Sequence, residues 1–197
     1  NHDSVGVIIP IKDKKDYFLV AADRNVYNLY WPSDDNENEA KLEHLITVDE
    51  RFGDSLMAEE MERSLSISNG LDWCPEYKKL YHIDSQTRKI VAYDFDEQSG
   101  QIQNKKIIFD MADHPNLEGI PDGMTADGSG NLWIALFGGS AYCTSVCFGG
   151  PDSANLFVTT SRLKLNEKEV SETPNAGSVF AISYLGVKGR IVHEAII

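Results

Sequence analysis

Residues 68–84 read SNGLDWCPEYKKLYHID, and residues 121–136 read PDGMTADGSGNLWIAL, which follows the same plan. Each stretch opens with a polar residue before a glycine, Asn69 in the first and Asp122 in the second. An apolar strand start, a turn, and a strand that begins with leucine and an aromatic residue follow in both. Asn69 and Asp122 lie 53 positions apart. A repeat of about 50 residues made of short strands and glycine-rich turns is typical of a β-propeller blade.

Alternating apolar and polar residues between turn signals predict strands on both sides of this stretch. One antiparallel blade of four strands is predicted at residues 5–11, 17–22, 26–31 and 42–48. A second complete blade is predicted at residues 71–73, 80–83, 90–95 and 106–109. Further strands are predicted at residues 133–137, 144–148, 156–160 and 177–183.

Two segments of the sequence are shorter than a repeat of about 50 residues predicts. The leucine–aromatic pair at Leu156 follows the one at Leu132 by 24 residues, where the repeat predicts about 50. We therefore expect half a blade to be absent after Asp122, and most of another to be absent between residues 48 and 68. The chain holds about four blades' worth of sequence by this period, and we expect residues 1–197 to form a single, partial propeller domain.

The composition of the chain argues against several classes of partner and favours one cellular compartment. The formal net charge is −13, which argues against nucleic acid or an anionic membrane as partner, because both need clustered Lys and Arg. No apolar stretch is long enough for a transmembrane helix, and no secretory leader precedes the first strand. The three cysteines are an odd number without a CxxC pair. They favour a reducing compartment, so a cytoplasmic location is expected.

Many segments in one order closely resemble the regucalcin family, which includes senescence-marker proteins, gluconolactonases and luciferin-regenerating enzymes. They are SNGLDW, YHIDS, IPDGM, GNLWIA, SVCFGG, LFVTTSR and NAGSVFAIS followed by LGVKG, and the resemblance runs from about residue 5 to residue 189. It implies an all-β, six-bladed β-propeller of which N-terminal and internal segments are missing here. It also implies a hydrolase of sugar lactones such as gluconolactone that holds one divalent metal ion, Ca²⁺ first, with Zn²⁺, Mg²⁺ or Mn²⁺ as alternatives.

The resemblance also implies the site residues. It makes Asn69 and Asp122 metal ligands, together with a glutamate in a segment that this chain does not contain. It gives substrate-binding roles to Arg51 of the RFGD motif and to Glu60 at the end of LMAEE. Gly53 stands where the family motif has an asparagine, which removes one substrate contact.

The residues themselves make a separate case for Asn69 and Asp122. Equivalent positions of neighbouring blades face the same axis, so the two side chains are expected to converge. Amide and carboxylate oxygens are hard ligands suited to Ca²⁺, Mg²⁺ or Mn²⁺, and Asp122 is also the expected proton-transfer group. The competing reading is that Asn-Gly and Asp-Gly simply make turns.

Other residues leave alternatives open. Asp84 either reaches the central channel of the expected propeller or caps a turn, and His82 is expected to be structural. The sequence has no GxSxG elbow, HExxH or P-loop, so serine hydrolase, zinc protease and NTPase readings lack support.

The leading prediction is a metal-dependent, calcium-binding sugar lactonase. The alternatives are a non-catalytic calcium-binding or interaction remnant, and a luciferin-regenerating enzyme-like protein. Self-association through unpaired strand edges is also expected.

Overall fold

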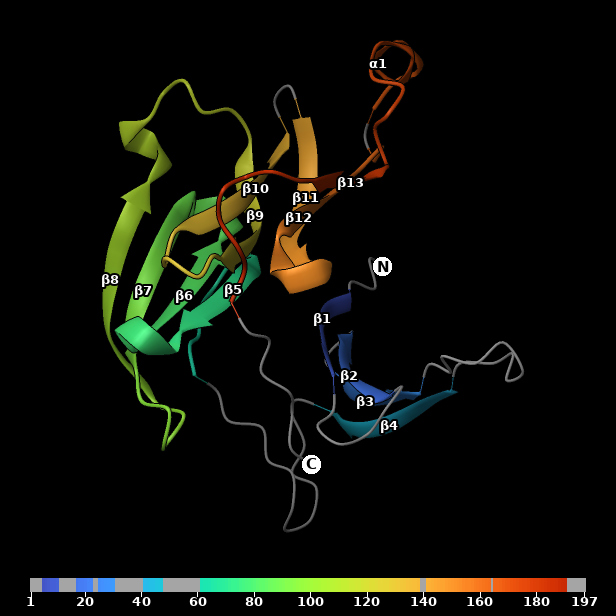
Figure 1. Ribbon diagram of the computed structural model, residues 1–197. Coiled ribbons are helices and arrows are strands. Elements are labelled where there is room, and N and C mark those ends of the chain that lie inside the picture. Colours follow the sequence, from blue (N-terminus) through green and yellow to red (C-terminus); the bar gives the residue numbers. More distant parts are fainter. Residues whose placement is uncertain are drawn as a thin grey trace. The chain divides into compact units, whose positions relative to one another are not determined.

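The structure is a computed structural model (Figure 1). It describes the backbone of residues 5–10, 17–22, 25–30 and 41–47, and the chain over residues 61–138, 141–163 and 165–190. The chain divides into two units, residues 1–60 with 192–197 and residues 61–191. The prediction of a single domain stays a prediction.

The first unit contains a four-stranded antiparallel sheet in the order β1-β2-β3-β4. Its strands are β1 (Val5–Pro10), β2 (Tyr17–Ala22), β3 (Asn25–Tyr30) and β4 (Lys41–Thr47). All four lie within one residue of the predicted bounds. The predicted antiparallel meander is therefore confirmed for this unit.

The second unit begins with another four-stranded antiparallel sheet, in the order β5-β6-β7-β8 (Figure 1). Its strands are β5 (Ser68–Cys74), β6 (Lys79–Asp84), β7 (Lys89–Phe95) and β8 (Ile102–Asp110). Single 3₁₀ turns follow three of them: η1 (Pro75–Tyr77), η2 (Ser85–Thr87) and η3 (Met111–Asp113). Lys78 and Arg88 close the first two turns with left-handed φ values of 49° and 58°.

The remaining strands form one five-stranded sheet in the order β13-β12-β11-β10-β9. They are β9 (Ile120–Ala126), β10 (Leu132–Gly138), β11 (Ala141–Gly149), β12 (Asn155–Thr160) and β13 (Val179–Ile182). The 3₁₀ turn η4 (Pro151–Ser153) joins β11 to β12, and the short helix α1 (Glu167–Glu172) lies between β12 and β13. The sequence predicts no helix there, although Asn166 and Glu169 form a capping box.

The pairing within this sheet is uneven. β10 and β11 pair through only two residue pairs, Phe137 with Tyr142 and Gly138 with Ala141. β11 then pairs with β12 from Cys143 to Gly149. The sheet thus consists of a two-stranded part, β9–β10, and a three-stranded part, β11–β13. The predicted absence of half a blade between these parts stays a prediction, and so does the blade count.

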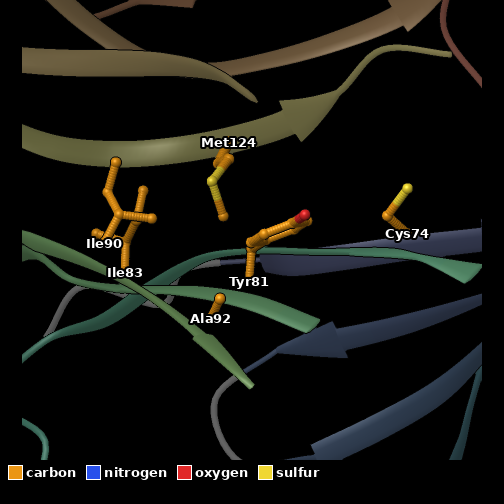
Figure 2. Packing of buried hydrophobic residues seen from close by; sticks show 6 residues of the cluster. All are labelled: Cys74, Tyr81, Ile83, Ile90, Ala92 and Met124. Carbon is orange, nitrogen blue, oxygen red and sulfur yellow. The ribbon is translucent and has the colours of Figure 1, made fainter. Parts of the chain in front are cut away.

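A hydrophobic core joins the β5–β8 sheet to β9 (Figure 2). Tyr81 and Ile83 of β6 alternate toward this core, because successive side chains of a strand point to opposite faces. Met124 of β9 packs against them. The other buried members are Cys74, Ile90 and Ala92. This packing fixes β9 against the β5–β8 sheet.

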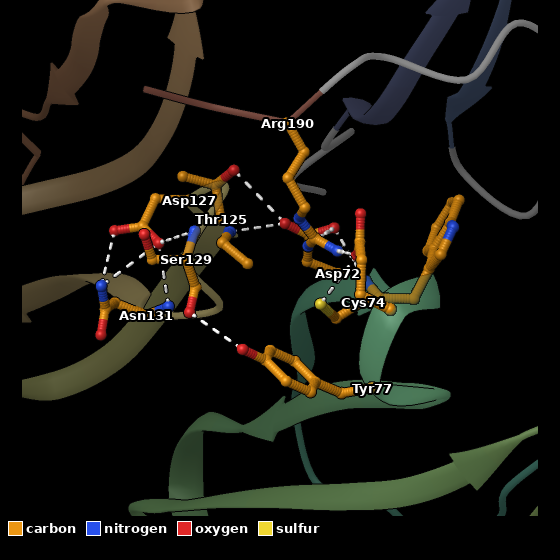
Figure 3. A network of polar contacts seen from close by, with 11 residues as sticks. Asp72, Cys74, Tyr77, Thr125, Asp127, Ser129, Asn131 and Arg190 are labelled. Atoms are coloured by element: carbon orange, nitrogen blue, oxygen red, sulfur yellow. Dashed lines mark hydrogen bonds and ion pairs between the residues drawn. The ribbon is translucent and has the colours of Figure 1, made fainter. Parts of the chain in front are cut away.

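A polar network fixes the other end of β5 to β9 (Figure 3). The Asp72 carboxylate accepts hydrogen bonds from the Ala126 backbone N–H at 2.6 Å and from Thr125 Oγ1 at 3.3 Å. Arg190, only 12% exposed, places Nη2 at 3.4 Å from Asp72 Oδ1. The segment before Arg190 is held by a backbone bond from Gly128 N–H to Lys188 O at 2.8 Å. The chain near residue 190 thus returns to the β5–β9 junction.

The end strands of the sheets and the length of the helices concern two further predictions, self-association and the absence of a transmembrane helix. Every residue of β13 is exposed, and Val179 and Ile182 are among its apolar side chains. β13 and β8 are end strands in the sheet orders of the described residues, and self-association through them stays a prediction. No helix within the described ranges is long and apolar enough to cross a membrane.

Candidate functional site

Asn69 and Asp122 each lie in a β-bulge. In β5, Ser68 pairs with Asp84 and Leu71 with His82, so Asn69 and Gly70 together oppose one residue of β6. A bulge inserts one extra residue and turns the local side chains away from the regular alternation.

The same bulge recurs in β9. Pro121 pairs with Leu136 and Met124 with Ile134, so Asp122 and Gly123 together oppose one residue of β10. The repeat in the sequence therefore corresponds to a repeated backbone irregularity. It gives the two polar residues the same place in two neighbouring strands.

Gly70 brings these two bulges together. A Cβ atom at this position would lie 2.6 Å from the carbonyl oxygen of Asp122 and 2.8 Å from Cβ of Met124. Only a residue without a side chain allows β5 to approach β9 this closely. The glycine after Asn69 is thus required for packing between strands, in addition to its turn propensity.

The side chains of Asn69 and Asp122 meet at this point. The Asn69 side chain interacts with the Asp122 carboxylate and lowers its pKa. Its Nδ2 atom also lies 3.2 Å from Ser85 Oγ. Ser85 is 1% exposed, and its own backbone N–H donates to Ile67 O at 3.0 Å. Ser85 carries no signal of this role in the sequence, although it directly follows the strand that ends YHID.

Burial controls the ionisation of Asp122. Removal from water raises the pKa of this carboxyl, and the hydrogen bond from Asn69 offsets part of the rise. The net direction is upward, so the ionised carboxylate is less well solvated here than in water. Among the residues that the structure describes, the Asn69 amide is the one group that lowers this pKa.

The donor set fits an oxygen-loving divalent cation in part. A partly desolvated carboxylate is stabilised by positive charge nearby, and the polarised amide NH₂ of Asn69 lies against it. Rotation of an asparagine amide exchanges its N and O atoms, which would present Oδ1 beside the carboxylate. The two residues supply one negative charge. Among the residues that the structure describes, no group of three or more His, Cys, Asp or Glu side chains could hold a metal ion.

The other predicted site residues do not join this pair. Arg51 and Glu60 lie outside the described residues, as does Gly53. Asp84 is buried, and its carboxylate accepts the backbone N–H groups of Ser66 at 3.1 Å and Ile67 at 3.0 Å. It therefore fastens the segment that leads into β5, and it makes no side-chain cap of the turn η2 that follows it.

His82 is buried in β6. Its Nε2 lies 3.0 Å from Ser68 Oγ, and burial lowers its pKa. These contacts join β5 to β6, as expected for a structural histidine.

Comparisons with known proteins identify the family of the chain. A family model described as the SMP-30/Gluconolactonase/LRE-like region matches residues 30–142. The Bacillus subtilis (strain 168) protein named "Putative sugar lactone lactonase YvrE" is 39% identical over 144 residues, covering 62% of this chain and 48% of that protein. Regucalcin of Oryctolagus cuniculus is 38% identical over 145 residues, covering 64% and 48%. The chain thus spans about half the length of these curated relatives.

Two solved structures share the fold. A luciferin-regenerating enzyme superposes with a TM-score of 0.80 at 26% identity, covering 100% of this chain and 83% of that one. A calcium-binding protein, regucalcin from Agrobacterium tumefaciens, gives a TM-score of 0.73 at 18% identity, covering 96% and 79%. The matched family model spans more than half of the chain, and the chain belongs to the SMP-30/gluconolactonase/LRE-like family.

Proposed function

We propose that the chain carries part of a metal-dependent sugar-lactone hydrolase that binds calcium through Asn69 and Asp122. The observation that supports this most is the meeting of these two side chains at equivalent bulges of β5 and β9. The names of two relatives, a sugar lactone lactonase and regucalcin, suggest the substrate class and the ion.

Each residue has a distinct role in this proposal. Asn69 and Asp122 would hold the cation through Oδ1 and the carboxylate. A bound divalent cation polarises a carbonyl and lowers the pKa of bound water. Asp122 would accept a proton at its carboxylate. Arg51 and Glu60 are proposed to orient the substrate.

A second candidate is a non-catalytic cation-binding protein. It is favoured by the small donor set, because affinity in oxygen sites depends on the number and charge of the ligands. Two side chains leave most of the coordination to water. A weak site of this kind would bind Ca²⁺ without orienting a lactone for attack.

Hydrolysis of gluconolactone with added Ca²⁺, Mg²⁺, Mn²⁺ or Zn²⁺ separates these candidates. We expect a slow, metal-dependent rate above the buffer background, which Asp122→Ala lowers by about 100-fold or more through loss of a ligand and base. Asp113→Ala removes an exposed carboxylate in η3 and serves as the matched control. Equal background rates in the wild-type chain and Asp122→Ala would exclude the enzyme and leave the cation-binding candidate.

A further inference from the structure

A third strand of the second unit carries the bulge seen in β5 and β9. In β11, Cys143 pairs with Thr160 and Val146 pairs with Val158. Thr144 and Ser145 therefore oppose one residue, Thr159, as Asn69 and Gly70 oppose one residue of β6. By this register, Thr144 holds the position that Asn69 has in β5 and Asp122 has in β9.

The packing between strands gives the same correspondence independently. A Cβ atom on Gly70 would lie 2.6 Å from the carbonyl oxygen of Asp122. A Cβ atom on Gly123 would lie 2.9 Å from the carbonyl oxygen of Thr144 and 2.7 Å from Cα of Ser145. The residue after each bulged polar position thus contacts the carbonyl of the next polar position. β9 is therefore offset from β5 in the same way as β11 is offset from β9.

The sequence alone does not reveal that Thr144 is equivalent to Asn69 and Asp122. Thr144 follows Asp122 by 22 residues, whereas Asp122 follows Asn69 by 53. Ser145 also replaces the glycine of the first two bulges. The pairing of β11 with β12 and the close approach of Gly123 to Thr144 and Ser145 show the equivalence.

The Thr144 hydroxyl retains hydrogen-bonding capacity. Its Oγ1 lies 2.7 Å from Thr159 Oγ1, and either atom can be the donor. A hydroxyl has one donor and two acceptor sites, so this bond leaves Thr144 able to donate or accept once more. The side chain is partly buried, so it is held in place without being fully enclosed.

We propose that Thr144 is a third residue of the Asn69–Asp122 site and hydrogen-bonds an oxygen-rich small molecule bound there. This inference rests on the proposed function. A neutral hydroxyl adds no charge for a cation, and the common ligands of Ca²⁺ are carboxylates, carbonyls and water. It suits instead the hydroxyl or carboxylate oxygens of a sugar lactone or of the aldonate formed from it.

The first test asks whether position 144 faces the cation site. Thr144→Asp adds a charged oxygen ligand, and we expect it to tighten Ca²⁺ binding about tenfold or more in isothermal titration calorimetry, because affinity rises with ligand charge. Gln98→Glu adds the same charge in the exposed turn between β7 and β8 and is expected to leave Ca²⁺ affinity at the wild-type value. A Thr144→Asp chain that folds and binds Ca²⁺ no more tightly than Gln98→Glu would overturn the inference.

The second test uses D-gluconate titrated into the Ca²⁺-saturated chain. Thr144→Val, which removes the hydroxyl with little change in shape, should weaken gluconate binding about tenfold. Thr144→Ser should restore it, because serine keeps the hydroxyl. Thr159→Val removes the structural partner of the Thr144 hydroxyl and should leave gluconate binding at the wild-type value. Thr125→Val removes a hydroxyl that bonds Asp72 and is the matched control.

The outcomes separate the two proposals. Wild-type binding that Asp122→Ala abolishes, with Thr144→Val indistinguishable from Thr125→Val, refutes the role of Thr144 and keeps the proposed function. A wild-type chain that binds neither Ca²⁺ nor gluconate refutes both.

Discussion

Asp122→Asn should melt at a higher temperature than the wild-type chain in EDTA and should show no further rise when Ca²⁺ is added. The substitution keeps the shape of the side chain and removes a charge that burial disfavours. Relief of roughly 1 kcal/mol would raise the melting temperature by about 2–4 °C in a chain of this size. The wild-type chain should gain stability from Ca²⁺, by about 2.7 kcal/mol when the ion is at 100 times its Kd.

The pH dependence of this effect has a definite sign. The pKa of Asp122 is raised in the folded chain, so its contribution to stability is present below the ordinary value of 3.8 and is lost as pH rises through the folded pKa. The melting difference between Asp122→Asn and wild type in EDTA should therefore be largest near neutral pH and vanish in acid. Thermal melts followed by circular dichroism across this range measure it.

Asp113→Asn is the control for this experiment, because it makes the same change at an exposed carboxylate. It should melt like the wild-type chain and retain the shift caused by Ca²⁺. An Asp122→Asn chain that is still stabilised by Ca²⁺ as strongly as wild type would contradict the assignment of Asp122 as a ligand.

Asp127→Ala should cause a large loss of stability without any effect that depends on cations. Asp127 is fully buried, and its carboxylate accepts hydrogen bonds from Ser129 N–H at 2.9 Å and Asn131 N–H at 3.0 Å (Figure 3). It also accepts a hydrogen bond from Trp133 Nε1 at 3.1 Å. Alanine would leave these donors of the β9–β10 turn without their acceptor. Since each unsatisfied buried donor costs about 1–3 kcal/mol, we expect a loss of about 3 kcal/mol or more. Urea unfolding followed by tryptophan fluorescence measures the change.

Low pH should reduce the contribution of Asp127 to the stability of the folded chain. Burial raises its pKa, but the hydrogen bonds from Asn131, Trp133 and the backbone outweigh burial, and the net pKa is lowered. Its contribution is thus present above the ordinary pKa of 3.8 and is lost as pH falls through the folded value. Asp113→Ala removes an exposed carboxylate of η3 and should cost less than about 1 kcal/mol. An Asp127→Ala chain with the wild-type urea midpoint would show that the turn does not depend on this carboxylate.

The strands could be predicted from sequence because apolar alternation and turn residues are local signals. Leu80–Tyr81 and Leu132–Trp133 mark second strands that the structure places in β6 and β10. The helix α1 was missed because it has only six residues and no apolar stripe, although the capping pair Asn166 and Glu169 was readable.

The site could be predicted only in part. Asn69 and Asp122 stand out because each precedes a glycine in a repeated stretch. Ser85 and Thr144 carry no such mark, since their relation to the pair depends on bulges and on packing between strands that are distant in sequence. Arg190 reaches Asp72 across 118 positions for the same reason.

The central claim is that Asn69 and Asp122 together hold a divalent cation, and anomalous scattering from crystals of the chain saturated with Ca²⁺ tests it directly. We predict a Ca²⁺ peak about 2.3–2.6 Å from both Asn69 Oδ1 and a carboxylate oxygen of Asp122. The peak should be absent from crystals of Asp122→Asn grown in the same way. A Ca²⁺ peak bound by other residues, or none between these two side chains in the wild-type crystals, would contradict the account.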